Sequence, residues 1–144
     1  MSVFIEYLLQ CIAAFFATVA FCILFSVPRK QYLFCGICGT ASWLVYCIFD
    51  GITGPVYATF FASVVIVLMS RSMAVLRKCP VSVFLITGII PLVPGSAIYY
   101  MAYYFFMDDM PKAGDYLFLT VKLASAIVMG IVCVFALPIK RVLK

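Results

Sequence analysis

The stretch Tyr7–Pro28 reads YLLQCIAAFFATVAFCILFSVP and holds no charged residue between Glu6 and Arg29. A helix rises about 1.5 Å per residue, so about 20 apolar residues cross the roughly 30 Å hydrocarbon core of a bilayer. This stretch therefore predicts a membrane-spanning helix. A cleaved signal peptide begins with a basic segment, and no basic residue precedes Arg29, so we expect the helix to remain as an anchor.

Similar uncharged runs follow along the chain: Gln31–Phe49, Gly51–Ser70, Cys79–Met107 and Tyr116–Ile139, the last interrupted by Lys122. Their continuous apolar character argues against a closed β-barrel, whose strands alternate over about 10 residues. We predict an all-α integral membrane protein with a single transmembrane domain over residues 1–144. Its about five transmembrane helices are expected near residues 7–27, 33–49, 55–70, 81–107 and 116–137.

The composition supports this class. Hydrophobic residues make up 67% and charged residues 10% of the chain, and the mean hydropathy is +1.24. Soluble domains have roughly 45–50% apolar and about 25% charged residues, so a soluble enzyme or a nucleic-acid-binding domain is excluded. Histidine is absent and no nucleotide-binding loop is present. We therefore expect no enzyme activity, no catalytic residue, no metal and no cofactor.

The basic residues fall on alternate connections between the expected helices. The acidic residues occupy the other connections, with Asp50 in one and Asp108, Asp109 and Asp115 in another, accompanied there by one lysine, Lys112. Basic loops face the cytoplasm, which predicts an outside N-terminus, a cytoplasmic C-terminus and a multi-pass protein of the plasma membrane. The basic residues behind this orientation are Arg29, Lys30, Arg71, Arg77, Lys78, Lys140, Arg141 and Lys144.

The fourth apolar run contains the most informative segment, Gly88-Ile89-Ile90-Pro91-Leu92-Val93-Pro94-Gly95-Ser96. Two prolines three residues apart remove backbone donors, so the helix is expected to break at Pro91–Gly95, close to the middle of the bilayer. Irregular backbone at that depth is tolerated only where protein or a watery cavity covers it. We identify Pro91, Pro94, Gly95 and Ser96 as candidate substrate-binding residues, because a helix restarting after Gly95 directs free amides at such a cavity. A proline kink packed against a neighbouring helix is the alternative.

Tyrosines follow the expected break. Ser96, Tyr99 and Tyr103 are spaced to share one helical face, so Tyr99 and Tyr103 join the candidate binding residues. Tyr100 and Tyr104 form an adjacent stripe. An interfacial belt of aromatic residues explains the tyrosines near Asp108 equally well.

Two charged residues are candidates for coupling transport to an ion. Lys122 interrupts an apolar run, and an intramembrane charge suggests function. It also lies about two turns from Asp115, so snorkelling to the outer surface is the favoured interpretation. Asp50 is interpreted as a turn residue, with proton coupling as the alternative.

The segment Cys35-Gly36-Ile37-Cys38-Gly39 matches a redox CxxC motif in spelling alone, because no strand–helix context surrounds it. Gly36 and Thr40 form a small-xxx-small pair, which favours close helix contact over thiol chemistry. A membrane thiol oxidoreductase is thus a distant alternative.

Three segments in this order resemble the small membrane subunit of the split threonine/serine exporters: Phe25-Ser26-Val27-Pro28, Cys35-Gly36-Ile37-Cys38-Gly39 and Ile90-Pro91-Leu92-Val93-Pro94-Gly95-Ser96-Ala97. The resemblance covers nearly the whole chain. It implies efflux of amino acids or small carboxylates, driven by a proton gradient, and a larger partner subunit bearing a soluble domain. Of the motif residues, it transfers a role to Pro91, Pro94 and Gly95.

These observations predict a subunit of a secondary transporter that exports threonine, serine or a related small carboxylate in the lipid bilayer. The odd helix count fits one half of an inverted pair, whose substrate site lies at the interface of the halves. The alternative is a non-transporting assembly or scaffold subunit of a membrane complex, whose broken helix only docks a partner.

Overall fold

The computed structural model describes residues 2–137 of the chain, with side chains from Ile5 onward, and this part contains helices and no strand. Three helices lead to the segment expected to break: α1 (Ser2–Leu24), α2 (Tyr32–Thr53) and α3 (Pro55–Arg77), with the short η1 (Arg29–Gln31) between α1 and α2. The segment itself forms α4 (Val81–Ile89), η2 (Ile90–Leu92) and α5 (Gly95–Phe106). A last long helix, α6 (Met110–Phe135), follows. The predicted all-helical class is confirmed.

Four helices are long and apolar enough to cross a membrane: α1, α2 together with η1, α3 and α6. The segments Val81–Leu92 and Gly95–Phe106 are bent by 47° at a short break and together provide a fifth apolar span of sufficient length. The protein is therefore a multi-pass membrane protein with four to five spans. The predicted break in the fourth helix is present.

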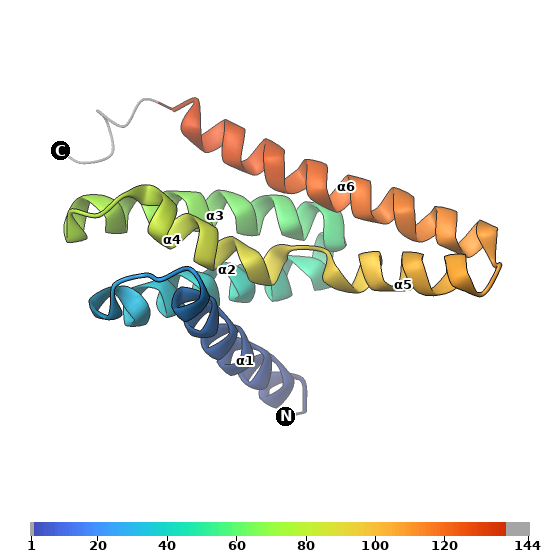
Figure 1. Ribbon diagram of the computed structural model, residues 1–144, viewed down its shortest axis with the longest axis horizontal. Helices are drawn as coiled ribbons and strands as arrows, with labels where there is room; N and C mark the ends of the chain where they lie inside the picture. Colours follow the sequence, from blue (N-terminus) through green and yellow to red (C-terminus); the bar gives the residue numbers. More distant parts are fainter. Residues whose placement is uncertain (1, 138–144) are drawn as a thin grey trace.

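The helices pack around α2 and α3, which contact each other most extensively (Figure 1). Helix α1 packs on α2, α6 packs on α3, and α4 contacts both central helices. Helix α5 differs from all the others, because α6 is its one extensive helix contact. Figure 1 shows α5 and the adjoining part of α6 extending as a hairpin past the ends of α2 and α3.

Glycines permit the closest helix contacts. A Cβ atom added at Gly36 or Gly39 on α2 would collide with Phe15 or Thr18 on α1. A Cβ at Gly130 on α6 would collide with Ser63 on α3. The expected close packing at the Cys35–Gly39 segment is thus confirmed, with Gly36 and Gly39 as the two contact positions.

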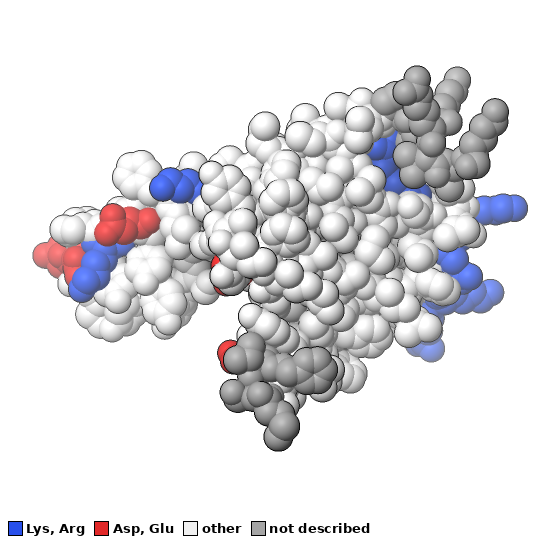
Figure 2. Space-filling model, turned by 180° about the vertical axis from the view of Figure 1, so that it is seen from behind, with Lys and Arg blue, Asp and Glu red and all other residues white. Residues whose placement is uncertain are grey.

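Charged residues gather at opposite ends of the molecule (Figure 2). The connections between α1 and α2 and between α3 and α4 carry basic residues at one end. The acidic residues around Asp109 lie at the far end, in the connection from α5 to α6. Lys140, Arg141 and Lys144, which contribute to the predicted orientation, lie outside the described residues.

The helix ends differ from those expected from the charge pattern. Helix α3 continues to Arg77 rather than residue 70, and α6 begins at Met110 rather than residue 116. Asp50 lies in the last turn of α2, so its interpretation as a turn residue is wrong; Gly54, with a φ of 87°, makes that turn. A charged side chain ends an apolar run of the sequence, but it does not end the helix. Charged residues either favour the helix or have little effect on its stability near the ends, so α3 and α6 extend past them.

Arg71 is a structural residue of α3 rather than a loop charge. Its guanidinium donates to the carbonyl oxygen of Val134 and, at 3.4 Å, to that of Leu137, and it lies 5.1 Å from the ring centroid of Phe135. Val134 O also accepts from the amide of Leu137 at 3.2 Å, so Arg71 adds a charged donor at the C-terminal end of α6. Arg71 thereby fastens the C-terminal end of α6 to α3.

We expect Arg71→Met to lower the free energy of unfolding by about 2 kcal/mol, because hydrogen bonds to a charged group are lost. Thermal unfolding of the protein in detergent measures the effect. Lys30→Met removes an exposed charge at the same end and serves as the control. Equal melting temperatures for the two variants would contradict the role of Arg71.

Candidate functional site

The break divides its span into two equal halves. Nine residues of α4 and three of η2 precede it, and the twelve residues of α5 follow it. Between them the chain turns at Val93 and Pro94, where the amide of Val93 donates to Ile90 O at 3.0 Å and that of Gly95 to Val93 O at 2.7 Å. The irregular backbone therefore lies midway along the span, as expected.

Helix α5 begins without a side-chain cap. Ile98 N donates to Pro94 O at 3.1 Å, whereas the amides of Ser96 and Ala97 have no backbone acceptor within residues 2–137. Ser96 therefore does not cap this helix with its hydroxyl group. Two amides and one hydroxyl are left to bind another group, and the partial positive charge of a helix start favours an anion.

The two sides of the break differ. The segment before the break is covered by protein, because η2 contacts α1, α2 and α3 and Leu92 is buried in a core cluster with Ile66 and Val67. The residues directly after the break, Gly95 and Ser96, are exposed, and a Cβ atom at Gly95 would meet no atom within 4 Å. The start of α5 is thus accessible to a ligand or to another chain.

A hollow of about 260 Å³ adjoins the break between α1, α2 and η2. Gln10 and Trp43 are its polar residues, and the remaining walls are Ala13, Ala14, Ala17 and Pro91. Pro91 is therefore the residue that connects the break with the hollow.

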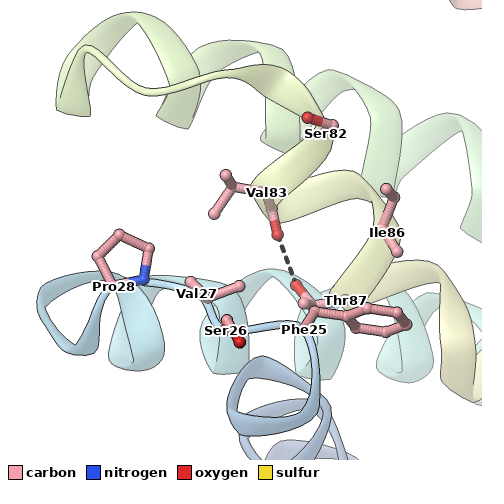
Figure 3. A pocket seen from close by; sticks show the side chains of 8 residues that line it. All are labelled: Phe25, Ser26, Val27, Pro28, Ser82, Val83, Ile86 and Thr87. Carbon is pink, nitrogen blue, oxygen red and sulfur yellow. Dashed lines mark hydrogen bonds between the residues drawn. The ribbon is translucent and has the colours of Figure 1, made fainter.

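A second hollow of about 240 Å³ lies between the end of α1 and the start of α4 (Figure 3). The motif Phe25–Pro28 forms one wall, and Ser82, Val83, Ile86 and Thr87 form the other. The hydroxyl of Thr87 is already used, since it donates to Val83 O at 2.9 Å. This hollow does not adjoin the break, so the one at Pro91 is the better candidate.

Five tyrosine rings form a continuous ladder along the α5–α6 hairpin. Tyr99 stacks on Tyr103, with ring centroids 6.4 Å apart, so the two predicted residues share a face. Tyr116 on α6 completes the ladder by stacking on Tyr100 at 5.3 Å and on Tyr104 at 5.6 Å. Tyr99 is 63% exposed. None of the five hydroxyl groups forms a hydrogen bond with another described residue.

The outer end of the ladder carries an ion pair. Lys112 Nζ lies 2.8 Å from Asp109 Oδ2 and 5.1 Å from the ring centroid of Tyr104. Asp109 also caps α6 by accepting from the amide of Lys112 at 3.3 Å. The hydrogen bond from Lys112 lowers the pKa of the Asp109 carboxyl below its ordinary value, so this carboxylate stays ionised at neutral pH.

The two coupling candidates lie apart from this group of residues. Lys122 is exposed on α6, and Asp50 is exposed at the end of α2. Neither has an ion-pair partner among the described side chains. The structure therefore does not bring Asp50 or Lys122 to the break.

Residues 10–137 match the family model described as Threonine/Serine exporter, ThrE. The chain belongs to the threonine/serine exporter family. No curated protein and no solved structure gives a match. Members of the threonine/serine exporter family are transporters, so this chain is a membrane protein of the exporter type, as the motifs indicated.

In this member of the threonine/serine exporter family, the CxxC segment is part of the packing. Cys35 and Cys38 are fully buried, and Cys35 shares a cluster with Cys22 on α1 and Phe84 on α4. Within the described residues, no group of cysteines and acids has a geometry for a metal ion. Buried cysteines of this kind act as small apolar residues.

Three residues of the exporter-family chain near the candidate site escaped the sequence analysis: Gln10, Trp43 and Tyr116. Gln10 is an amide inside the first apolar run, and Trp43 is the single tryptophan of the chain. Each is a polar group in an apolar helix, which is the signal that identifies such residues. Tyr116 was hidden because it belongs to a different helix from the other tyrosines.

Proposed function

We propose that this protein is the small membrane subunit of a secondary transporter that exports threonine, serine or a related small carboxylate. The observation that carries the proposal is the broken span. Its second half begins with the free amides of Ser96 and Ala97 midway along the span, in a chain of the exporter family. In transporters, half-helix starts of this kind face the anionic group of the substrate.

The proposed substrate contacts are Pro91, Pro94, Gly95 and Ser96 at the break, followed by Tyr99 and Tyr103 on the ladder. The amides bind the carboxylate, and the ladder provides phenol groups along the outer half of the span. The ammonium group of Lys112 lies over the ring face of Tyr104. An amino-acid substrate carries the same ammonium group, which aromatic faces attract. Asp50 and Lys122 stay secondary candidates for coupling to protons.

A larger partner subunit with a soluble domain completes the transporter in this proposal. The exposed face of α5 supports it, because this helix has one extensive neighbour and carries phenol groups without acceptors. A phenol inside a membrane requires a hydrogen-bond partner, and lipid tails provide none. Following the charge pattern, the basic end is placed in the cytoplasm and the acidic end of the hairpin outside.

Reconstitution tests this function. The chain alone, the larger subunit alone and the two together are placed in vesicles loaded with threonine, serine or succinate, and efflux is measured with and without a proton gradient. We expect efflux of at least one of these substrates when both subunits are present. Full transport by the larger subunit alone would instead favour the scaffold function.

A further inference from the structure

One buried side chain joins the two basic connections of the chain, from α1 to α2 and from α3 to α4. Gln31, in η1, accepts a hydrogen bond at its Oε1 from Arg77 Nε at 3.1 Å. Its Nε2 group donates to Cys79 Sγ at 3.2 Å. Gln31 is 6% exposed, although it lies in a connection between two helices. The two connections are thereby held together.

This join concentrates positive charge. Arg29 and Lys30 precede Gln31 and Lys78 follows Arg77, so four exposed cations surround the Arg77–Gln31 hydrogen bond. We call these four residues the basic cluster. Figure 2 shows blue side chains and no red ones at this end of the face in view. The acidic residues belong to other parts of the described chain, namely the first half of α1, the end of α2 and the α5–α6 hairpin: Glu6, Asp50, Asp108, Asp109 and Asp115.

Arg77 is oriented for binding through two donors at once. Its guanidinium carbon lies 4.3 Å from the ring centroid of Phe34, and its Nε is occupied by Gln31. The terminal groups Nη1 and Nη2 have no acceptor among the described residues. A planar guanidinium fixed in this way offers two parallel N–H donors, which match the oxygen spacing of a phosphate group.

Lys78 is not required for the turn that it occupies. It ends α3 with a φ of 52°, a left-handed conformation that glycine adopts more readily. Glycine would therefore make the same turn with less strain. What the lysine adds at this position is a cation.

Large apolar side chains border the basic cluster. Leu76, directly before Arg77, is 69% exposed, and Leu33, directly before Phe34, is 58% exposed. In a chain that spans a membrane, such side chains face acyl chains. A ligand that combines an anionic group with acyl chains matches both parts of this surface, whereas a free anion would use the cations alone. Basic residues next to the end of a membrane helix attract anionic lipid headgroups.

We propose that the basic cluster binds the phosphate group of an anionic phospholipid. Nη1 and Nη2 of Arg77 donate to two phosphate oxygens, and the three neighbouring cations attract the negative charge of the headgroup. The acyl chains lie along Leu33 and Leu76. Basic residues that set only the orientation in the membrane need charge but no fixed geometry, so the Gln31 bridge is the feature that distinguishes a binding site. The site is independent of the proposed transport function, because it uses neither the break nor the tyrosine ladder.

Native mass spectrometry of the full chain in a non-ionic detergent tests this site. The protein is titrated with phosphatidylglycerol, which is anionic, and with phosphatidylcholine, which is zwitterionic. We expect a dissociation constant at least about ten-fold lower for phosphatidylglycerol, because each neighbouring cation adds to the attraction for an anionic headgroup. Inorganic phosphate is not expected to displace the bound lipid, since it cannot use the apolar part of the surface.

Two variants retain every charge of the cluster and change its geometry. Arg77→Lys loses the parallel donors and Gln31→Leu loses the bridge. Each is expected to raise the dissociation constant for phosphatidylglycerol at least about five-fold, the scale of one lost hydrogen bond to a charged group. Their orientation in the membrane should stay the same, because the charge pattern does.

A third variant separates lipid binding from stability. Lys78→Gly removes one cation and relieves the strained turn, so it should weaken binding about five-fold while the melting temperature without lipid does not fall. Lys122→Gln is the matched control, because it removes one exposed cation from α6 and should leave the binding of phosphatidylglycerol unchanged.

Several outcomes would contradict the lipid site. Equal binding of the two lipids, or unchanged affinity in both Arg77→Lys and Gln31→Leu, would overturn it. Displacement by inorganic phosphate would assign the cluster to a free anion. A cluster that shows no lipid preference but needs Arg77 to retain the larger subunit would be a protein interface instead. Each of these results leaves the exporter function intact, since efflux is measured separately.

Discussion

Gly95→Leu is expected to reduce efflux to background while the protein still folds and inserts. The leucine side chain would lie over the start of α5 and cover the amides of Ser96 and Ala97. The fold should tolerate it, because a Cβ atom at Gly95 meets no atom within 4 Å and leucine is a better helix former than glycine. Efflux from cells lacking any related transporter, normalised to the amount of inserted protein, measures the effect.

Gly51→Leu is the matched control for this prediction. Gly51 lies in the last turn of α2, and a Cβ atom there also meets nothing within 4 Å. The control should retain normal efflux. The efflux of Gly95→Ala should lie between that of the unmodified protein and that of Gly95→Leu. Normal efflux in Gly95→Leu would contradict the assignment of the site to the start of α5.

Gly39→Leu is expected to abolish the folded protein. A Cβ atom at Gly39 would lie 3.0 Å from Cγ2 and 3.1 Å from Cβ of Thr18, and still closer to its hydroxyl. Thr18 is fully buried and its hydroxyl donates to Ala14 O at 2.8 Å, so its side chain has no free space to turn. Even Gly39→Ala should cost about 1–3 kcal/mol, as overpacking does elsewhere.

A size exchange checks this explanation. Because the nearest atoms all belong to the Thr18 side chain, Thr18→Gly combined with Gly39→Ala should recover most of the stability that Gly39→Ala loses. Size-exclusion chromatography and thermal unfolding in detergent report the folded fraction, and Gly51→Ala is the neutral control. Failure of the exchange to recover stability would show that the α1–α2 contact is not limited by these two residues.

The helical class and the break were predictable because each depends on local chemistry. A run such as Tyr7–Pro28 has no other stable arrangement in a bilayer, and Pro91 and Pro94 remove backbone donors wherever they occur. The helix ends were less predictable, because Arg71 and Asp115 lie outside the uncharged runs of the sequence and yet within α3 and α6.

The hollow was not predictable from the chain, because its residues meet through packing. Gln10 and Trp43 are distant in sequence and come together only when α1 packs on α2. The same holds for Tyr116, which reaches Tyr100 and Tyr104 because the chain reverses direction between α5 and α6. Such pairs follow from the crossing of two helices, and no local pattern specifies that crossing.

The sparse contacts of α5 also determine how the molecule comes apart. Its connection to the remaining helices runs through α6, which is held by Gly130 against Ser63 and by Arg71 at its C-terminal end. Local opening follows contact density, so we expect α5 to open at a lower free energy than the central helices α2 and α3. Amide hydrogen exchange is therefore expected to be faster in α5, which follows Pro94, than in α3.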